Sequence, residues 1–124
     1  MSTGIYSFTQ SHRLKKADEF SSVFIFRKVK HGKYLKIHYK PNELSNSRLG
    51  IIVSKKNHKR ANKRNYMKRT IRELFRHNQA IWNNYDLIVR VNKFFTPSEF
   101  EEVKQEFNYL TKVLQSKANK LIPI

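Results

Sequence analysis

KKNHKRANKRNYMKRTIRELFR, residues 55–76, decides the fold of this chain: it carries ten lysines and arginines and a single acid, Glu73. At about 100° of helix rotation per residue, its apolar and its cationic side chains separate onto opposite sides. The apolar side continues past residue 76 and comprises Met67, Ile71, Leu74, Phe75, Asn78, Ile81 and Trp82, whereas the other arc comprises Asn65, Lys68, Arg69, Arg72 and Arg76. We therefore predict a long amphipathic helix that buries one side and leaves the other strongly cationic.

The missing acids indicate what the cationic side does. A solvated basic tail would not need an apolar stripe, because nothing in it is buried. An ordinary surface helix mixes both signs of charge, commonly with Glu four residues before Lys or Arg. Since this stretch has the stripe and lacks the acids, it predicts a face that binds a polyanion.

The whole chain is similarly unbalanced, with a formal net charge of +17 in 124 residues. Nucleic acid is the commonest partner for such charge, and an anionic membrane is the competing one. No long apolar run is present, and residues 1–16 lack the hydrophobic stretch of a signal peptide. The absence of cysteine excludes a disulfide framework and a thiolate nucleophile. We expect one cytoplasmic domain, 1–124, with residues 1–13 and 116–124 loose.

The flanking segments predict a mixed α/β fold. Residues 14–26 have helical periodicity, and a Thr-Pro-Ser-Glu helix start begins at residue 96. Residues 34–40 alternate, which predicts a strand with one apolar face and one basic face. Residues 48–54 include consecutive apolar residues, which we interpret as a central strand. A further strand at 87–91 completes a strand–helix–strand spacing, so these two strands should be parallel.

Two phenylalanines in the first helix have two interpretations. Phe20 and Phe24 share a helix face with Val23, and sequence alone favours core packing for them. If that helix lies beside an open sheet face, an exposed pair would instead stack on nucleic-acid bases.

The search for catalytic chemistry finds no site in the protein. The histidines, at positions 12, 31, 38, 58 and 77, are scattered, and no two have metal-ligand spacing on one helix. No phosphate-binding loop, dinucleotide fingerprint or nucleophile elbow is present. The nine acids fall mostly at helix starts and do not form the carboxylate cluster that a metal-dependent nuclease needs. These patterns favour a binding module.

Three blocks of the sequence together resemble the signature of the bacterial ribonuclease P protein family. RLGIIVSKKNHKRANKRNYMKRTIRELFR, from Arg48, is similar to that family's strand ending in V-S-K-K and its R-N-R-x-K-R-x-x-R-E helix. HRLKKADEFSSVF resembles its R-L-x-x-x-x-x-F-x-x-V-F opening, and YDLIVRV resembles its late strand. The resemblance covers roughly Phe8 to Leu114.

The resemblance implies a fold and a function. The implied fold is a two-layer α-β sandwich of order αβββαβα with a left-handed βαβ crossover, which is ribosomal-protein-S5-domain-2-like. The implied function is that of a ribonuclease P subunit, which binds the catalytic RNA and the 5′ leader of precursor tRNA and promotes endonucleolytic removal of that leader. The RNA is the implied catalyst and holds most of the Mg²⁺, so the protein has no catalytic or metal site. The implied partners are the catalytic RNA and precursor tRNA, with no membrane and no obligate protein partner.

The resemblance also implies site residues. Those that grip the catalytic RNA would be Lys55, Lys56, Arg60, Arg64, Asn65, Lys68, Arg69 and Arg72. The leader cleft would hold Phe20 and Phe24, with Lys36 and His38 from the basic strand face, which reverses the core interpretation of the phenylalanines. One position departs from the motif, because Tyr66 stands at the third position of its R-N-R triplet.

Two other functions remain as alternatives. A structural, ribosome-associated RNA-binding protein could use the same basic helix to brace folded RNA. A self-sufficient protein nuclease is disfavoured, because the chain lacks a carboxylate cluster.

Overall fold

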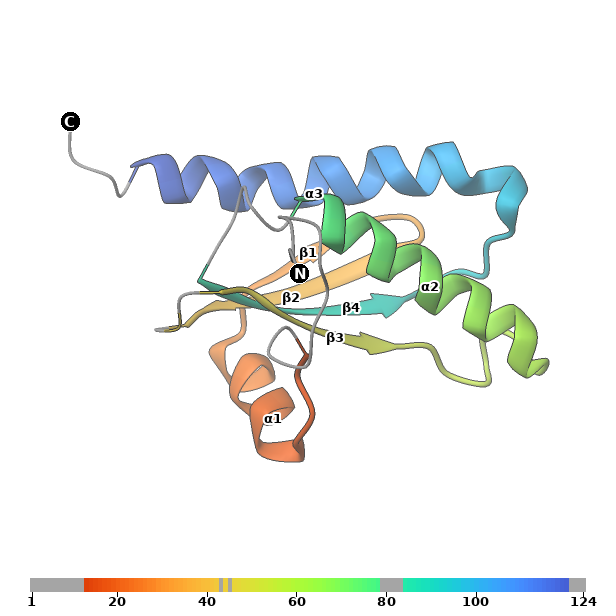
Figure 1. Cartoon of the computed structure of the whole chain (residues 1–124), viewed down its shortest axis with the longest axis horizontal. Coiled ribbons are helices and arrows are strands. Elements are labelled where there is room, and N and C mark those ends of the chain that lie inside the picture. Colours follow the sequence, from red (N-terminus) through yellow and green to blue (C-terminus); the bar gives the residue numbers. More distant parts are fainter. Residues whose placement is uncertain (1–12, 43, 45, 79–83, 121–124) are drawn as a thin grey trace, which may run out of the picture.

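The computed structural model describes residues 13–42, 44, 46–78 and 84–120. A four-stranded sheet lies at its centre, with two helices on one face and one helix on the other (Figure 1). In chain order the elements are α1 (Ala17–Phe26), β1 (Val29–His31), β2 (Leu35–Pro41), β3 (Arg48–Ile52), α2 (Ala61–Asn78), β4 (Tyr85–Val91), the 3-10 turn η2 (Pro97–Glu99) and α3 (Phe100–Lys120). The αβββαβα order is confirmed.

The sheet has the strand order β1-β2-β4-β3. The β1–β2 and β2–β4 pairs are antiparallel, and the β3–β4 pair is parallel, as the strand–helix–strand spacing predicted. Parallel neighbours need a crossover, which α2 supplies. In Figure 1 both arrows point the same way, with β3 in front of β4 and α2 above them, so the crossover is left-handed. This is the uncommon hand for such a connection.

The main core lies between the sheet and the α2–α3 pair. Alternate residues of β2 and β4 point into it, which is the expected pattern for strands with one face on a core. Its buried members include Leu35, Ile37, Leu87, Val89, Met67, Ile71, Phe75, Val103 and Phe107. Ile81 and Trp82, predicted for the same apolar stripe, lie outside the described residues.

A smaller cluster on the opposite face seats α1. Leu14, Val23 and Ile88 are buried there, with Phe20 and Ile52 packed against them. Because α1 is short, it covers only part of this face of the sheet (Figure 1).

β3 is an edge strand, so the prediction that it is central is wrong. Its apolar run has a different cause, which is cover on both faces. Leu49 and Ile51 belong to the main core, whereas Gly50 and Ile52 lie against α1 and its cluster. A strand covered on both sides does not alternate. Part of its outer edge is also paired, because the Leu14 N–H donates to the Leu49 carbonyl at 3.0 Å, which limits the unpaired edge.

The first helix begins three residues later than its periodicity suggested, at Ala17 rather than Leu14, because Leu14 is bonded to the sheet edge. Glu19 closes the first turn by accepting the backbone N–H groups of Lys15 at 2.7 Å and Lys16 at 3.0 Å. A carboxylate in that position satisfies backbone donors that have no partner within the helix.

The last helix has the predicted start and a longer end. The Thr96 hydroxyl accepts the Ser98 N–H at 3.2 Å, and Glu99 accepts the Thr96 N–H at 2.7 Å, which completes the predicted cap. The turn passes through η2 before α3 begins at Phe100. α3 then runs to Lys120, into the stretch 116–124 that we expected to be loose.

A carboxylate from α3 holds the turn between β1 and β2. Glu106 accepts the backbone N–H groups of Lys33 at 2.9 Å, Tyr34 at 2.9 Å and Leu35 at 2.7 Å. Gly32 lies so close to this carboxylate that a Cβ at that position would collide with it. The start of β2 is therefore fixed to the helical layer by one side chain.

We expect Glu106→Ala to lower the free energy of unfolding by about 1.5–3 kcal/mol, because three backbone donors lose a charged acceptor. Denaturant unfolding followed by circular dichroism measures this change. Glu101→Ala, an exposed acid on the first turn of the same helix, is the control and should change stability far less. Equal losses from the two variants would contradict the assigned role.

Candidate nucleic-acid interface

We call the uncovered part of the sheet beside α1 the open face, and a row of basic side chains crosses it. Strand register pairs His31 with Lys36 and Lys36 with Arg90, so the three side chains lie abreast on β1, β2 and β4. No acid among the described residues forms an ion pair with any of them. The like charges of Lys36 and Arg90, placed side by side, repel one another, so this row favours an anionic ligand such as a phosphodiester backbone.

An aromatic pair borders this row. Phe24 on α1 meets His38 on β2 edge to face, with ring centroids 4.8 Å apart. The Phe24 side chain is 36% exposed, which leaves ring surface for a base to stack on. Burial is the main cause that lowers the pKa of His38, and the neighbouring charges of Lys36, Arg90 and His31 add to it. The imidazole is therefore neutral at pH 7 and presents a ring without a charge.

Phe20, one helical turn before Phe24, has a different environment. Its ring covers Gly50 so closely that a Cβ on the glycine would lie 2.6 Å from ring carbons. It also packs against the small cluster that seats α1. The structure therefore separates the two predicted aromatics: Phe20 holds α1 on β3, and Phe24 is open to solvent.

Phe20 also belongs to a second cationic surface. Its ring lines a cavity of about 230 Å³ together with Arg13, Lys68 and Arg72. We call the surface formed by these three cations the α2 flank. Lys68 and Arg72 are one turn apart on α2, and neither has a hydrogen bond or ion pair to another described residue. Cations from two separate segments thus converge on a space with no acid in its lining.

The other predicted cations are divided between two roles. Arg64 has a structural contact, because its Nη1 donates to the carbonyls of His58 at 2.9 Å and Lys59 at 2.7 Å. This contact ties the turns before α2 to the helix, which begins at Ala61 and not where β3 ends. Exposed side chains in the turns and on the outer side of α2 are those of Lys55, Lys56, Arg60, Asn65 and Arg69.

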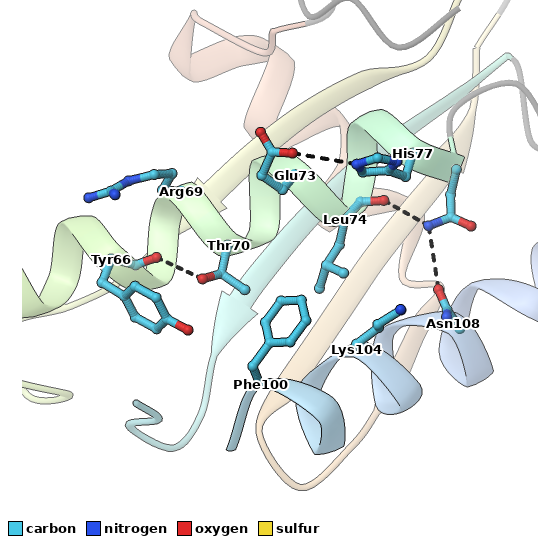
Figure 2. Close-up of a pocket in the computed structure, with 10 residues that line it drawn as sticks. Tyr66, Arg69, Thr70, Glu73, Leu74, His77, Phe100, Lys104 and Asn108 are labelled. Carbon is cyan, nitrogen blue, oxygen red and sulfur yellow. Dashed lines mark hydrogen bonds and ion pairs between the residues drawn. The ribbon is translucent and has the colours of Figure 1, made fainter. Parts of the chain in front are cut away.

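Tyr66 does not point outward with these cations. It is partly buried and packs against Phe95, with ring centroids 6.1 Å apart. In Figure 2 its side chain extends from α2 toward α3, on the side where Phe100 rises to meet it. The residue that departs from the family motif is therefore directed between the two helices.

An ion-pair network positions α1 beside the open face. Arg48 donates to Asp86 from Nε at 2.9 Å and from Nη2 at 2.8 Å, and to Glu19 from Nη1 at 2.9 Å. Its hydrogen bond to Asp86 is the main cause that raises the pKa of Arg48. Asp86 is 4% exposed and also accepts from Asn42 Nδ2 at 2.7 Å. Asp86 therefore fixes the guanidinium of Arg48, and through Glu19 that guanidinium holds α1.

Sequence reasoning missed three basic residues at these surfaces. Arg90 carried a readable signal, because it interrupts an apolar strand at a position that shares a face with Asp86. His31 carried none, since β1 is too short to show a period. Arg13 reaches the α2 flank through a bridge to Leu49, which no local pattern indicates.

Metal-binding and membrane-spanning features are both absent from the described residues. Among the described residues, no group of three or more His, Asp or Glu side chains is placed to hold a metal ion. No helix in the described part of the chain has the length and apolarity needed to cross a bilayer.

Comparisons with known proteins all point to one family. The family model described as Ribonuclease P matches residues 8–115. A protein of Azoarcus sp. called ribonuclease P protein component is 46% identical over 99 residues, which cover 80% of this chain and 82% of the relative. Two similar solved structures are RNase P proteins. The Staphylococcus aureus protein has a TM-score of 0.73 and 26% identity, covering 82% of this chain and 94% of that one. The Thermotoga maritima protein has a TM-score of 0.65 and 28% identity, covering 81% and 96%.

The pH dependence of stability should report on His38. Its pKa is lowered from 6.5 in the folded chain, so its contribution to stability is present above pH 6.5 and is lost as pH falls through the folded pKa. We expect the free energy of unfolding to fall more between pH 7 and pH 5 in the wild type than in His38→Gln.

Histidine ring resonances followed by NMR measure the same pKa directly. Lys36→Gln should raise the pKa of His38, because it removes a neighbouring like charge. A wild-type value at or above 6.5 would overturn the assigned environment.

Proposed function

This chain belongs to the ribonuclease P protein family and is a tRNA-processing subunit of that ribonucleoprotein, in which we propose that it binds the catalytic RNA and the precursor's 5′ leader with two separate surfaces. The α2 flank and the outer side of α2 would bind the catalytic RNA. The open face, with Phe24 and His38 at its border, would hold the single-stranded leader of precursor tRNA.

The observation that carries this proposal is that Phe20 and Phe24, one turn apart on α1, belong to two cationic surfaces of different construction. Beside Phe20, Lys68 and Arg72 converge with no other aromatic in the cavity lining. Phe24 and His38 add ring surface to the basic row of the open face. Clustered cations suit folded RNA, whose phosphates are close together. Aromatic rings beside cations suit single strands, because every base has a face that can stack.

Catalysis would be carried by the RNA subunit. The described carboxylates do not form a metal site, and several have structural partners: Glu19 and Asp86 bind Arg48, and Glu106 binds backbone N–H groups. The donor set therefore does not fit a protein-held Mg²⁺, and we assign the ion to RNA phosphates. The protein's cations would screen repulsion between those phosphates, which lowers the Mg²⁺ concentration that the folded RNA requires.

Reconstitution tests the proposal. Adding this chain to a bacterial catalytic RNA should permit removal of the leader from precursor tRNA at low Mg²⁺, where the RNA alone is slow. Lys68→Gln with Arg72→Gln should weaken binding of the catalytic RNA and make the salt dependence shallower by close to one unit per lost phosphate contact.

Lys112→Gln, an exposed lysine on α3, is the matched control and should keep the wild-type salt slope. Processing unaffected by the chain, together with cosedimentation on ribosomal particles, would favour the ribosome-associated alternative. Cleavage by the chain without RNA would overturn the assignment of catalysis.

The leader cleft gives a second prediction. Phe24→Ala should weaken the binding of precursor tRNA by about 1–3 kcal/mol, the range for one lost base stack. The affinity for mature tRNA should be unchanged. Phe24 is exposed enough that stability should change little.

Phe20→Ala is the comparison variant. It removes the ring that packs α1 against Gly50, so it should reduce thermal stability. It should also weaken the binding of both precursor and mature tRNA. Equal weakening of precursor and mature tRNA by Phe24→Ala would show that Phe24 acts through the fold and not on the leader.

A further inference from the structure

A groove between α2 and α3 shares Arg69 with the outer side of α2, but its other lining residues belong to neither proposed surface. It has a volume of about 540 Å³, within the size range of pockets that hold one small ligand. α2 contributes Tyr66, Arg69, Thr70, Glu73, Leu74, His77 and Asn78, and α3 contributes Phe100, Lys104 and Asn108. Figure 2 shows the two helices side by side. Tyr66, Thr70, Leu74, Phe100 and Lys104 lie on the sides that face each other, whereas Arg69, Glu73 and His77 lie along the other side of α2. We call it the interhelical groove.

Aromatic and apolar side chains form its walls. Tyr66 from α2 and Phe100 from α3 reach toward one another, and Leu74 lies beside Phe100 (Figure 2). Tyr66 is held in place by its edge-to-face contact with Phe95. A flat ring entering the groove would therefore meet one aromatic side chain from each helix.

The rim carries more free positive than negative charge. Lys104 and Arg69 have no ion pair with another described residue. Glu73, the one carboxylate in the lining, is already bound to Arg76 at 2.6 Å and lies 3.5 Å from His77. An anionic group at the rim would thus find cations available and the acid neutralised.

Amide groups close one end of the groove. The Asn78 side chain donates to the Leu74 carbonyl at 2.7 Å and to Asn108 Oδ1 at 3.4 Å. This leaves the Asn108 amide N–H groups without a partner among the described residues. A side-chain amide beside an aromatic slot is the arrangement that reads the edge of an unpaired base.

We propose that the interhelical groove binds one unpaired nucleotide of an RNA, with the base between Tyr66 and Phe100 and its phosphate at Lys104. The proposal rests on the proposed function, because the groove shares α2 with the surface assigned to the catalytic RNA. It gives the protein a third RNA contact, on the helical layer. An apolar peptide fits the lining less well, since it would leave the rim cations and the Asn108 amide unpaired.

Site-directed photo-crosslinking tests the proposal, and the chain suits it because it contains no cysteine. Lys104→Cys and the control Lys112→Cys are each labelled with a short aryl azide, irradiated in complex with catalytic RNA, and mapped by primer extension. We expect the label at 104 to reach one or two unpaired nucleotides, and the label at 112 to give only a diffuse background. Crosslinks that appear only after precursor tRNA is added, and on that RNA, would assign the nucleotide to the substrate.

Three outcomes would overturn the proposal: crosslinks from 104 no stronger than from 112, crosslinks confined to base-paired segments, or crosslinks to a second protein chain. Processing at low Mg²⁺ is measured on the same labelled proteins. If processing is intact and no specific crosslink forms, only the groove proposal fails. If unlabelled wild type neither binds the catalytic RNA nor promotes processing, the proposed function itself fails.

Binding measurements separate stacking from a structural role of Tyr66. Tyr66→Leu keeps an apolar side chain against Phe95 and should weaken RNA binding by about tenfold, since one aromatic face is lost. Tyr66→Phe keeps the ring and should bind like the wild type. Thermal unfolding of each variant monitors the fold. Equal affinity of the Leu and Phe variants, with both folded, would contradict a stacking role.

Discussion

The bond between Arg48 and its two carboxylates is the interaction on which the RNA-facing side of this protein depends. Arg48 lies on an edge strand, Asp86 on the neighbouring strand and Glu19 on α1. The Arg48 guanidinium therefore fixes α1 to the sheet, in addition to the small apolar cluster that seats the same helix. The buried partner, Asp86, makes this a demanding arrangement, because losing either charge leaves the other without compensation. The positions of Phe20 and Phe24 follow from it.

The chain separates its charges by role. Its nine acids are outnumbered by 26 lysines and arginines. Glu106 holds backbone N–H groups, Glu19 and Glu73 bind arginines, and Glu102 accepts the Tyr34 hydroxyl, all within the fold. Among the other cations, Lys36, Lys68 and Arg69 lie on the open face, the α2 flank and the outer side of α2 respectively, and Lys104 and Lys112 are exposed on α3. Electrostatic repulsion in the isolated protein is the expected cost of this arrangement, and binding to RNA relieves it.

Sequence patterns predicted the elements with a clear period, and failed where distant segments decide the outcome. The amphipathic α2 and the cap of α3 were readable because their signals are local. β1 was implied only by the family resemblance, and β3 was placed wrongly because cover on two faces looks the same in sequence as a central position. The site followed the same rule. The basic face of β2 was visible in the alternation of Lys36 and His38, whereas Arg13 and the buried direction of Tyr66 depend on tertiary packing.

The contact between Gly50 and Phe20 has an evolutionary consequence. Any side chain larger than hydrogen at position 50 would displace the ring at position 20 and lift α1 from its seat. Inherited changes at these two positions are therefore tolerated only in combination, with a bulkier residue at one matched by a smaller residue at the other. The pair should vary together across lineages, although the two residues are 30 positions apart in sequence.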